Sequence, residues 1–388
     1  MTYVSINPAV LRWARQRAGL SKEQLAKKVG KARKPEVVRA WETGKARPTF
    51  RQAQKLARAL RIPMGYLFLS APPTTTVPIV DFRSLPDAER GRFSPDLEDV
   101  LNDALRKRDW MREWRVREGA DPLPFVGKFS QEDAPESIAA DIRARLALPM
   151  PPAQRARSWE EHLRLLVRHA ESADIMVLQS GIVGSNSRRT LSVEEFRGFA
   201  LIDRYAPLIF INARDSIAGR IFTLAHELGH IWTGTGGVSN PEPAPHPFPE
   251  TPAIERLCNQ VAAELLVPAH ELRRRWTQGQ DILHTAQEMA RAFRVSVFVV
   301  LIRARELGLI SSEGFQIAYD QAQEKVRRTP SRRGRGNFYH NLQARNGLLL
   351  LREIGIALRQ EALLYQEASR LLNVQPQTLE NLLQQIGL

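Results

Sequence analysis

The chain has 388 residues, of which 43% are hydrophobic and 25% charged, as in an ordinary globular protein with two or three domains. Its longest apolar run, residues 297–302, is far too short to span a bilayer, and residues 1–5 lack the charged flank and apolar core of a signal peptide. The single cysteine, Cys258, excludes an internal disulfide. We therefore expect a cytoplasmic protein with no membrane partner.

The net charge of +14 is concentrated in residues 1–70, which hold sixteen Lys or Arg and three Glu. This balance suggests a polyanionic partner such as nucleic acid, with a merely soluble basic surface as the alternative. Residues that typically begin or end helices predict four short helices in this segment, which begin after Asn7, Ser21, Lys34 and Thr49. Ser21 and Gln24 have the spacing of a capping box, so the start of the second helix is the best defined.

Three stretches of this segment, Leu20-Ser21-x-x-Gln24-Leu25-Ala26-x-x-Val29-Gly30, Ala40-Trp41-Glu42-x-Gly44-Lys45 and Pro48, resemble the helix-turn-helix of the phage-repressor and Cro-like (XRE) family. The resemblance covers residues 7–69 and implies a five-helix-type unit that binds double-stranded DNA, with homodimerisation as a further expectation. The turn at 31–35 is about two residues longer than usual. The candidate base contacts are Arg33, Lys34, Glu36 and Arg39, and the candidate phosphate contacts are Lys22 and Lys45. A helical module for protein contacts is the alternative.

Proline-rich segments predict where the rest of the chain divides. Residues 71–78 read as an extended linker, and residues 149–152 as a second break. Helices are expected over 96–117, 135–146, 159–170, 253–267, 286–309 and 348–388, with strands over 175–179 and 208–212. The predicted domains are 1–70 (helix-turn-helix), 71–150 (linker and helical connection), 151–310 (catalytic core) and 311–388 (helical C-terminal region).

A helix from about residue 217 carries His226-Glu227-Leu228-Gly229-His230. Histidines four apart project from one helix face, so both imidazoles can reach one metal ion at roughly 2.0–2.1 Å. Glu227 can meet water beside the ion without being a ligand. The neighbouring residues are apolar, so the helix should be buried, where polar side chains are costly without a task. A pair of surface or core histidines is the alternative.

A catalytic zinc site needs a third protein ligand. Position 236, six residues after the second histidine, is Gly236, which excludes the extended three-histidine pattern. His246 in the following loop is one candidate. Glu255 and Glu264 on the next helix are stronger ones, and because they are nine residues apart, one can face the metal and the other solvent.

The segments Phe222–His230 and Glu255-x-x-x-Asn259-x-x-Ala262-Ala263-x-Leu265-Leu266-x-Pro268 resemble the ImmA/IrrE metallopeptidases over roughly residues 160–300. The resemblance implies a zincin-like α+β core with a small sheet, Glu255 as the third ligand, and one Zn²⁺ per chain, with Mn²⁺ as an alternative ion. It also implies that Glu227 is the general base and acid for attack of metal-activated water on a peptide bond. Tyr205, His246 and His270 are weak candidates for the oxyanion stabiliser, and Cys258 is expected to be a packed small residue.

Together these features predict a mainly α, multidomain protein: a regulatory zinc metalloendopeptidase with a DNA-binding domain. By resemblance its substrate would be a transcriptional repressor or an antitoxin, which it would cleave in response to stress. The substrate could itself contain an XRE-like domain. The alternative is a DNA-binding regulator or antitoxin whose peptidase-like domain is a sensor or is inactive.

Overall fold

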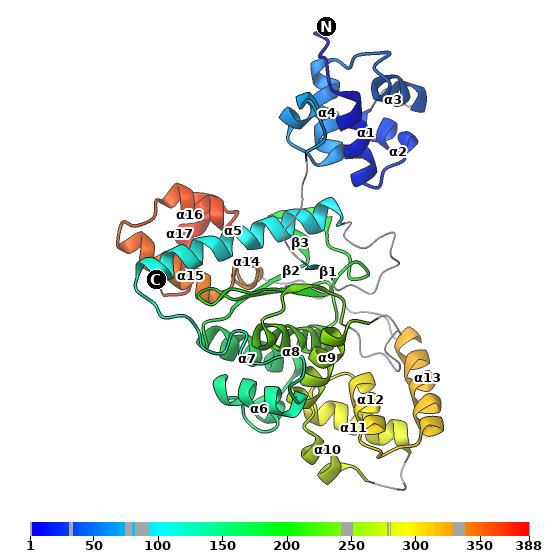
Figure 1. The fold of residues 1–388 in the computed structure, drawn as a ribbon, viewed down its shortest axis with the longest axis vertical. Helices are drawn as coiled ribbons and strands as arrows, with labels where there is room; N and C mark the ends of the chain where they lie inside the picture. Colours follow the sequence, from blue (N-terminus) through cyan, green and yellow to red (C-terminus); the bar gives the residue numbers. More distant parts are fainter. Residues whose placement is uncertain are drawn as a thin grey trace. The chain divides into compact units, whose positions relative to one another are not determined.

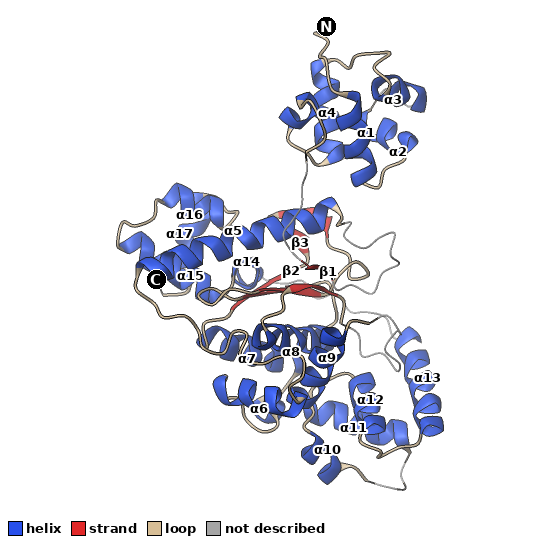
Figure 2. Ribbon diagram, in the orientation of Figure 1, coloured by secondary structure: helices blue, strands red, loops and turns tan. Residues whose placement is uncertain are grey.

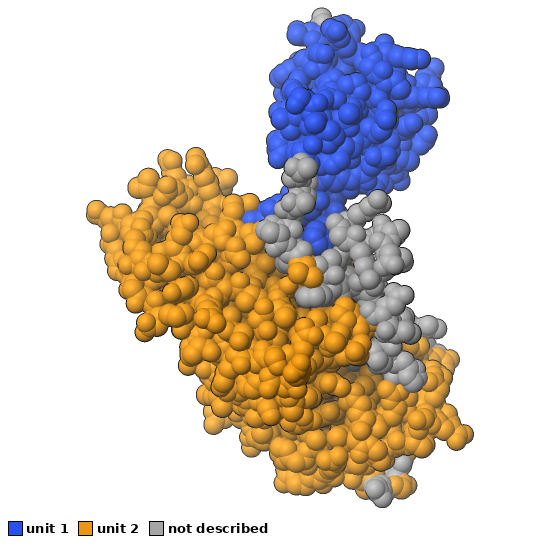
Figure 3. All heavy atoms as spheres, viewed as in Figure 1, with its two compact units in different colours: residues 1–78, 91–102 blue, residues 79–90, 103–388 orange. Residues whose placement is uncertain are grey.

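The computed structural model describes residues 2–30, 34–73, 80–81, 93–241, 251–277, 279, 281–328 and 338–387. Within it the chain divides into two compact units (Figure 3). The first comprises residues 1–78 and 91–102, and the second comprises residues 79–90 and 103–388. We describe each unit by itself.

The first unit is a small helical bundle. Its helices are α1 (Pro8–Arg17), α2 (Lys22–Val29), α3 (Pro35–Glu42), α4 (Phe50–Leu60) and the 3-10 helix η1 (Met64–Phe68). Asn7, Ser21 and Thr49 cap α1, α2 and α4 through their side chains, and α2 and α4 both begin with a capping box. The helices enclose an apolar core that includes Leu11, Leu25, Val38, Trp41, Leu56 and Leu60, as the sequence predicts.

The second unit is built on a five-stranded mixed sheet (Figure 2). Its strand order is β1 (Val80–Asp81), β7 (Gly237–Ser239), β5 (Gly198–Leu201), β6 (Leu208–Asn212) and β2 (Met176–Ser180). Strand β5 runs antiparallel to both its neighbours, whereas β2 is parallel to β6 and β1 is parallel to β7. A separate hairpin joins β3 (Ile182–Val183) to β4 (Asn186–Thr190).

Helices cover both faces of the sheet (Figure 1). On one face lie α7 (Trp159–Ser172), α8 (Ile217–Thr233) and α9 (Ala253–Leu266), and on the other lie α14 (Phe338–Asn346) and α15 (Leu348–Arg359). Every residue of β5 and β6 is buried. This two-sided cover explains the continuous apolar run Leu208–Ile211, because alternation is expected only where one face meets water.

The remaining helices surround this layered core. Helix α6 (Pro135–Arg145) packs against α9, and α11 (Ile282–Phe293), α12 (Val297–Glu306) and α13 (Ser312–Arg328) pack on one another. The other elements are α5 (Pro95–Arg117), η2 (Pro152–Arg155), α10 (Ala269–Arg275), α16 (Tyr365–Leu371) and α17 (Pro376–Gln385). Among the described residues, no helix has both the length and the apolar character needed to cross a membrane.

The predicted fold class, mainly α with a small central sheet, is confirmed. Strands β2 and β6 were predicted, but β1, β5 and β7 were not. Helices α13 and α14 were not predicted either, and β7 lies within a stretch that was expected to be a loop. These strands have two to four residues, too few to show a period, and they form because neighbouring strands complete their hydrogen bonds. The boundaries between the four predicted domains stay a prediction.

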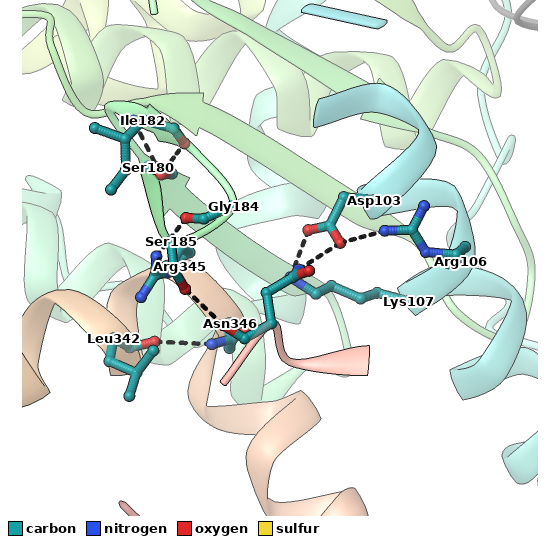
Figure 4. Close-up of polar contacts among 11 residues, drawn as sticks. Asp103, Arg106, Lys107, Ser180, Ile182, Gly184, Ser185, Leu342, Arg345 and Asn346 are labelled. Carbon is teal, nitrogen blue, oxygen red and sulfur yellow. Dashed lines mark hydrogen bonds and ion pairs between the residues drawn. The ribbon is translucent and has the colours of Figure 1, made fainter. Parts of the chain in front are cut away.

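A buried polar cluster joins α5 to the C-terminal helices (Figure 4). Asp103 accepts hydrogen bonds from Lys107 Nζ at 2.7 Å, from Arg106 at 2.8 Å and from Asn373 Nδ2 at 2.7 Å. Ser185, in the turn of the β3–β4 hairpin, donates to the carbonyl oxygen of Asn373 at 2.5 Å. The Lys107 side chain is only 1% exposed, and burial lowers its pKa, although the Asp103 carboxylate opposes this.

Removing Asp103 should therefore leave an uncompensated buried charge. We expect Asp103→Ala to lower the free energy of unfolding by about 3–5 kcal/mol, the typical cost of breaking a buried ion pair. Asp109→Ala is the matched control on the same helix, because its pair with Arg108 is half exposed and should contribute at most about 1 kcal/mol. Urea unfolding of the full chain measures both values. Equal decreases in the free energy of unfolding of the two variants would show that the buried cluster does not stabilise the fold.

Candidate metal centre

Helix α8 carries the histidine pair, and its two ends are well defined. The Ser216 side chain accepts a hydrogen bond from the backbone N–H of Gly219 at 3.0 Å, and Gly234 ends the helix in the left-handed conformation. Every residue from Ile221 to Thr233 is buried, because the helix lies between the sheet and helices α7 and α9. His226 and His230 thus project from one side of a helix segment, residues 221–233, that has no solvent-exposed face.

Helix α9 approaches α8 very closely at Gly229. A Cβ atom at position 229 would lie 3.2 Å from the sulfur of Cys258 and 3.3 Å from its Cα. Glycine at this position therefore allows the two backbones to meet, and Glu255, one turn before Cys258, then reaches the histidines. Cys258 is fully buried, and burial raises the pKa of its thiol well above the usual value, which fits a packed and unreactive residue.

Three side chains converge between the two helices. The Nε2 atoms of His226 and His230 are 3.0 Å apart. The Glu255 carboxylate lies 3.2 Å from His226 Nε2 through one oxygen and 3.0 Å from His230 Nε2 through the other. The histidines are 0% exposed and the Glu255 side chain is 6% exposed. The structure thus brings together His226, His230 and Glu255 as a group that could hold a metal ion.

Further polar residues hold the two imidazoles from behind. Asn259 Oδ1 lies 3.0 Å from His226 Nδ1, and Thr235 Oγ1 lies 3.4 Å from His230 Nδ1. Because a carbonyl oxygen can only accept, His226 Nδ1 is the donor in this contact. Ligating histidines commonly have such a partner on the other nitrogen. Sequence reasoning assigned these two residues no role, although Asn259 lies one turn after Glu255 on the same helix.

Glu227 is separate from this group and fully buried. Its Oε1 accepts a hydrogen bond from the Ser239 hydroxyl on β7, a contact that the sequence did not reveal. Among the described residues, Oε2 is buried without a hydrogen-bond partner. Burial raises the pKa of Glu227 to about 8, and the Glu255 charge adds to the rise, whereas His230 and Ser239 oppose it.

The charge balance of the site fits a bound cation. Burial alone would raise the pKa of Glu255, but the two imidazoles outweigh that effect and hold the pKa at about 2. Glu255 is thus an anion in a buried place, in contact with both imidazoles. Two imidazole nitrogens and a carboxylate are the ligands that zinc prefers, and three protein ligands leave one position open.

Glu264, the other candidate on α9, does not belong to the site. It was expected to lie at the surface or behind the metal ligands, and its carboxylate is in fact buried in an ion pair with Arg303 of α12. It also accepts the backbone N–H of Ala269 at 3.2 Å, at the start of α10. Its role here is to join α9, α10 and α12. A buried charge with a partner on a distant segment cannot be told from a surface charge in the sequence alone.

The weak oxyanion candidates gain no support. His270 has a side chain that is 63% exposed and lies 3.9 Å from Glu271, and His246 lies outside the described residues. For Tyr205 the structure shows a backbone contact, because its carbonyl oxygen accepts a hydrogen bond from Arg115 at 2.8 Å. None of the three belongs to the group of potential metal ligands.

The candidate DNA contacts of the first unit gather around α3. Lys34 is its N-cap residue, Glu36 and Arg39 lie on the helix, and Lys45 follows it; all four are exposed. Lys22, at the start of α2, is half-buried and lies 4.0 Å from the carboxylate of Glu42. Arg33 lies outside the described residues, as does most of the extended turn.

Comparison with known protein families supports both units. Residues 170–305, which include α8 and α9, match the model of peptidase family M78, the IrrE N-terminal-like domain. Residues 11–67 match the helix-turn-helix family model. The search of curated proteins returned no match. Residues 170–305 are therefore similar to the IrrE N-terminal-like domain of peptidase family M78, and residues 11–67 are similar to a helix-turn-helix domain.

Proposed function

We propose that this protein is a regulatory zinc-dependent endopeptidase that cleaves a DNA-binding repressor or an antitoxin. His226, His230 and Glu255 would hold the zinc ion, and Glu227 would act as general base and then as general acid. The observation that carries the proposal is the convergence of two imidazole nitrogens and one carboxylate within 3.0–3.2 Å, beside a second buried carboxyl group.

When bound, the ion would supply an acidified water and polarise the peptide carbonyl. The chain's own residues provide the rest. Ser239 fixes one oxygen of Glu227, so the other oxygen, which has no partner among the described residues, is the one that can take a proton. The raised pKa of Glu227 suits a group that must hold this proton and then deliver it to the leaving amine. Asn259 and Thr235 keep the imidazoles in place.

A second function is supported by the burial of the site. His226, Glu227 and His230 are all 0% exposed, so a substrate cannot reach them in this conformation. The peptidase-like domain could then serve as a sensor within a DNA-binding regulator or antitoxin. The two functions differ in whether the buried site opens to a polypeptide, and the variants described below separate them.

The helix-turn-helix domain supports binding to double-stranded DNA. We propose that α3 enters the major groove, with Lys34, Glu36 and Arg39 near base edges and with Lys22 and Lys45 at phosphates. Arg33 belongs to the same proposal. Because phage-repressor domains read paired half-sites, we further propose a homodimer that acts in the cytoplasm, where its operator and its protein substrate would both be present.

Metal content tests the proposed ligands. Purified wild-type protein, prepared without chelator, should contain about one zinc per chain by elemental mass spectrometry, and His226→Ala or Glu255→Ala should lose most of it. His270→Ala is the matched control, because this histidine is exposed and lies outside the proposed ligand group. A wild-type protein without zinc or manganese would overturn the site, and so would full metal content in Glu255→Ala.

Glu227→Gln tests the proposed chemistry separately from metal binding. The variant should keep its metal. It should cleave a co-expressed repressor, one encoded next to the gene for this protein, about 10²–10⁴-fold more slowly than the wild type does, which is the usual contribution of a general acid–base residue. Ser239→Ala should cause a smaller loss, because it removes only the partner that holds Glu227. Repressor cleavage is followed by immunoblot. If the Glu227→Gln variant still regulates the promoter that the protein controls as the wild type does, the sensor function is favoured over the peptidase function.

Salt dependence tests the proposed DNA interface. The logarithm of the binding constant for operator DNA should fall linearly with the logarithm of salt concentration, and each lost phosphate contact should reduce the slope by about 0.9. Lys45→Ala should therefore flatten the slope by about that amount. Arg168→Ala, an exposed arginine on α7 of the second unit, is the matched control. Binding that does not depend on salt would exclude a phosphate-contacting surface.

A further inference from the structure

A second cavity lies in the second unit, away from the residues of the metal centre. It has a volume of about 580 Å³ and lies between one face of α5 and the segment that runs from the end of α15 through α16. These helices lie on the side of the sheet opposite α8 and α9 (Figure 1). The volume falls within the range of about 300–1,000 Å³ that is typical of small-molecule sites.

Two tryptophans of α5 line this cavity as a stacked pair. Trp110 and Trp114 both line it, and their rings are parallel within 5° with centroids 6.1 Å apart. Trp114 is only 2% exposed, and its indole N–H donates to Glu353 of α15 at 2.9 Å. Trp110 is half-buried. Trp114 is almost fully buried and fixed by its neighbours, so Trp110 is the ring that an aromatic ligand would meet, on a support that needs little reordering.

Three arginines also line the cavity, from both of its walls. Arg117 stacks on Trp114, with its guanidinium carbon 4.9 Å from the ring centroid. Arg106 is held by Asp103 at 2.8 Å, and Asp103 is itself fixed by the buried cluster around Lys107 (Figure 4). Arg370 comes from α16 on the opposite wall, and within the described part of the chain no ion pair to its guanidinium is found.

Two carboxylates complete the lining, and one of them is already engaged. Glu367 accepts a hydrogen bond from the backbone N–H of Leu364 at 3.3 Å, at the start of α16. Glu113 lies on α5 between the two tryptophans in sequence and can accept a hydrogen bond from an amino or hydroxyl group. The cavity thus offers stacking surfaces, donors for an anion and an acceptor for a neutral polar group.

We propose that this cavity binds a small molecule that joins a planar aromatic ring to an anionic group, of about the size of a mononucleotide. The ring would stack on Trp110, the more exposed tryptophan of the pair, as nucleobases stack on aromatic side chains. Guanidinium groups recognise phosphates and carboxylates through paired hydrogen bonds, and Arg370 and Arg117 would supply these. Glu113 would accept from an exocyclic amine or a hydroxyl group of the ligand.

Titration calorimetry of the full chain with four probes tests this proposal. AMP and indole-3-acetate both carry a ring and an anion, whereas adenosine lacks the anion and ribose 5-phosphate lacks the ring. At least one of the first two should bind with a dissociation constant below about 1 mM, and the partial probes should bind at least about tenfold more weakly. AMP as the tighter of the two would identify a nucleotide site, and indole-3-acetate an aromatic-carboxylate site.

Variants place the bound probe in the cavity. Arg370→Gln and Trp110→Ala should each weaken binding at least about tenfold, and circular dichroism should show an unchanged fold because neither side chain is fully buried. Arg112→Gln is the matched control on α5, since Arg112 does not line the cavity and lies 3.4 Å from Asp203. His226→Ala should leave binding unchanged, which separates this site from the metal centre. The proposal is overturned if neither ring-plus-anion probe binds, or if both cavity variants bind like the wild type.

Discussion

The close approach of α8 and α9 at Gly229 is the contact on which the metal centre depends. A Cβ atom at this position would come within 3.2–3.4 Å of Cys258 atoms, so even an alanine would require α9 to give by a few tenths of an ångström. The third ligand is carried by a different helix from the first two, and a shift of 1 Å would already spoil the geometry that catalytic groups require. The glycine between the two histidines therefore does more than fill a variable position in the motif.

The same packing sets the electrostatics of the site. Two carboxyl groups, Glu227 and Glu255, are buried within one layer of the protein, and burial disfavours the charge on each. The imidazoles keep Glu255 ionised, whereas Glu227 has a pKa near 8 and, among the described residues, accepts a hydrogen bond from Ser239. Two acids with opposite pKa shifts are suited to different tasks, one as a ligand and one as a proton carrier.

The sheet owes its stability to layers from distant parts of the chain. Helices α7, α8 and α9 cover one face, and α14 and α15, more than a hundred residues beyond α8, cover the other (Figure 1). The C-terminal helices are held in turn by α5 through the Asp103–Lys107 cluster and through the bond from Trp114 to Glu353. The proposed ligand cavity lies along this α5 seam. A ligand there would contact α5, which is joined to α15 through Trp114 and Glu353, and α16.

The sequence by itself determined the features that depend on local spacing. The capping boxes at Ser21 and Thr49, the histidines one turn apart on α8, and the long apolar helices and strands follow from short-range sterics and periodicity. The resemblance of the two motifs to known families further indicated both domains, and the family models support them.

Only the tertiary structure decided which distant groups meet. Ser239 as the partner of Glu227, Arg303 as the partner of Glu264, and the short strands β1, β5 and β7 all depend on segments far apart in the chain. Spacing could not choose between Glu255 and Glu264, because both lie on one helix and both are buried. The choice depends on which face of α9 packs against α8, and that packing is fixed by the whole core rather than by any local pattern.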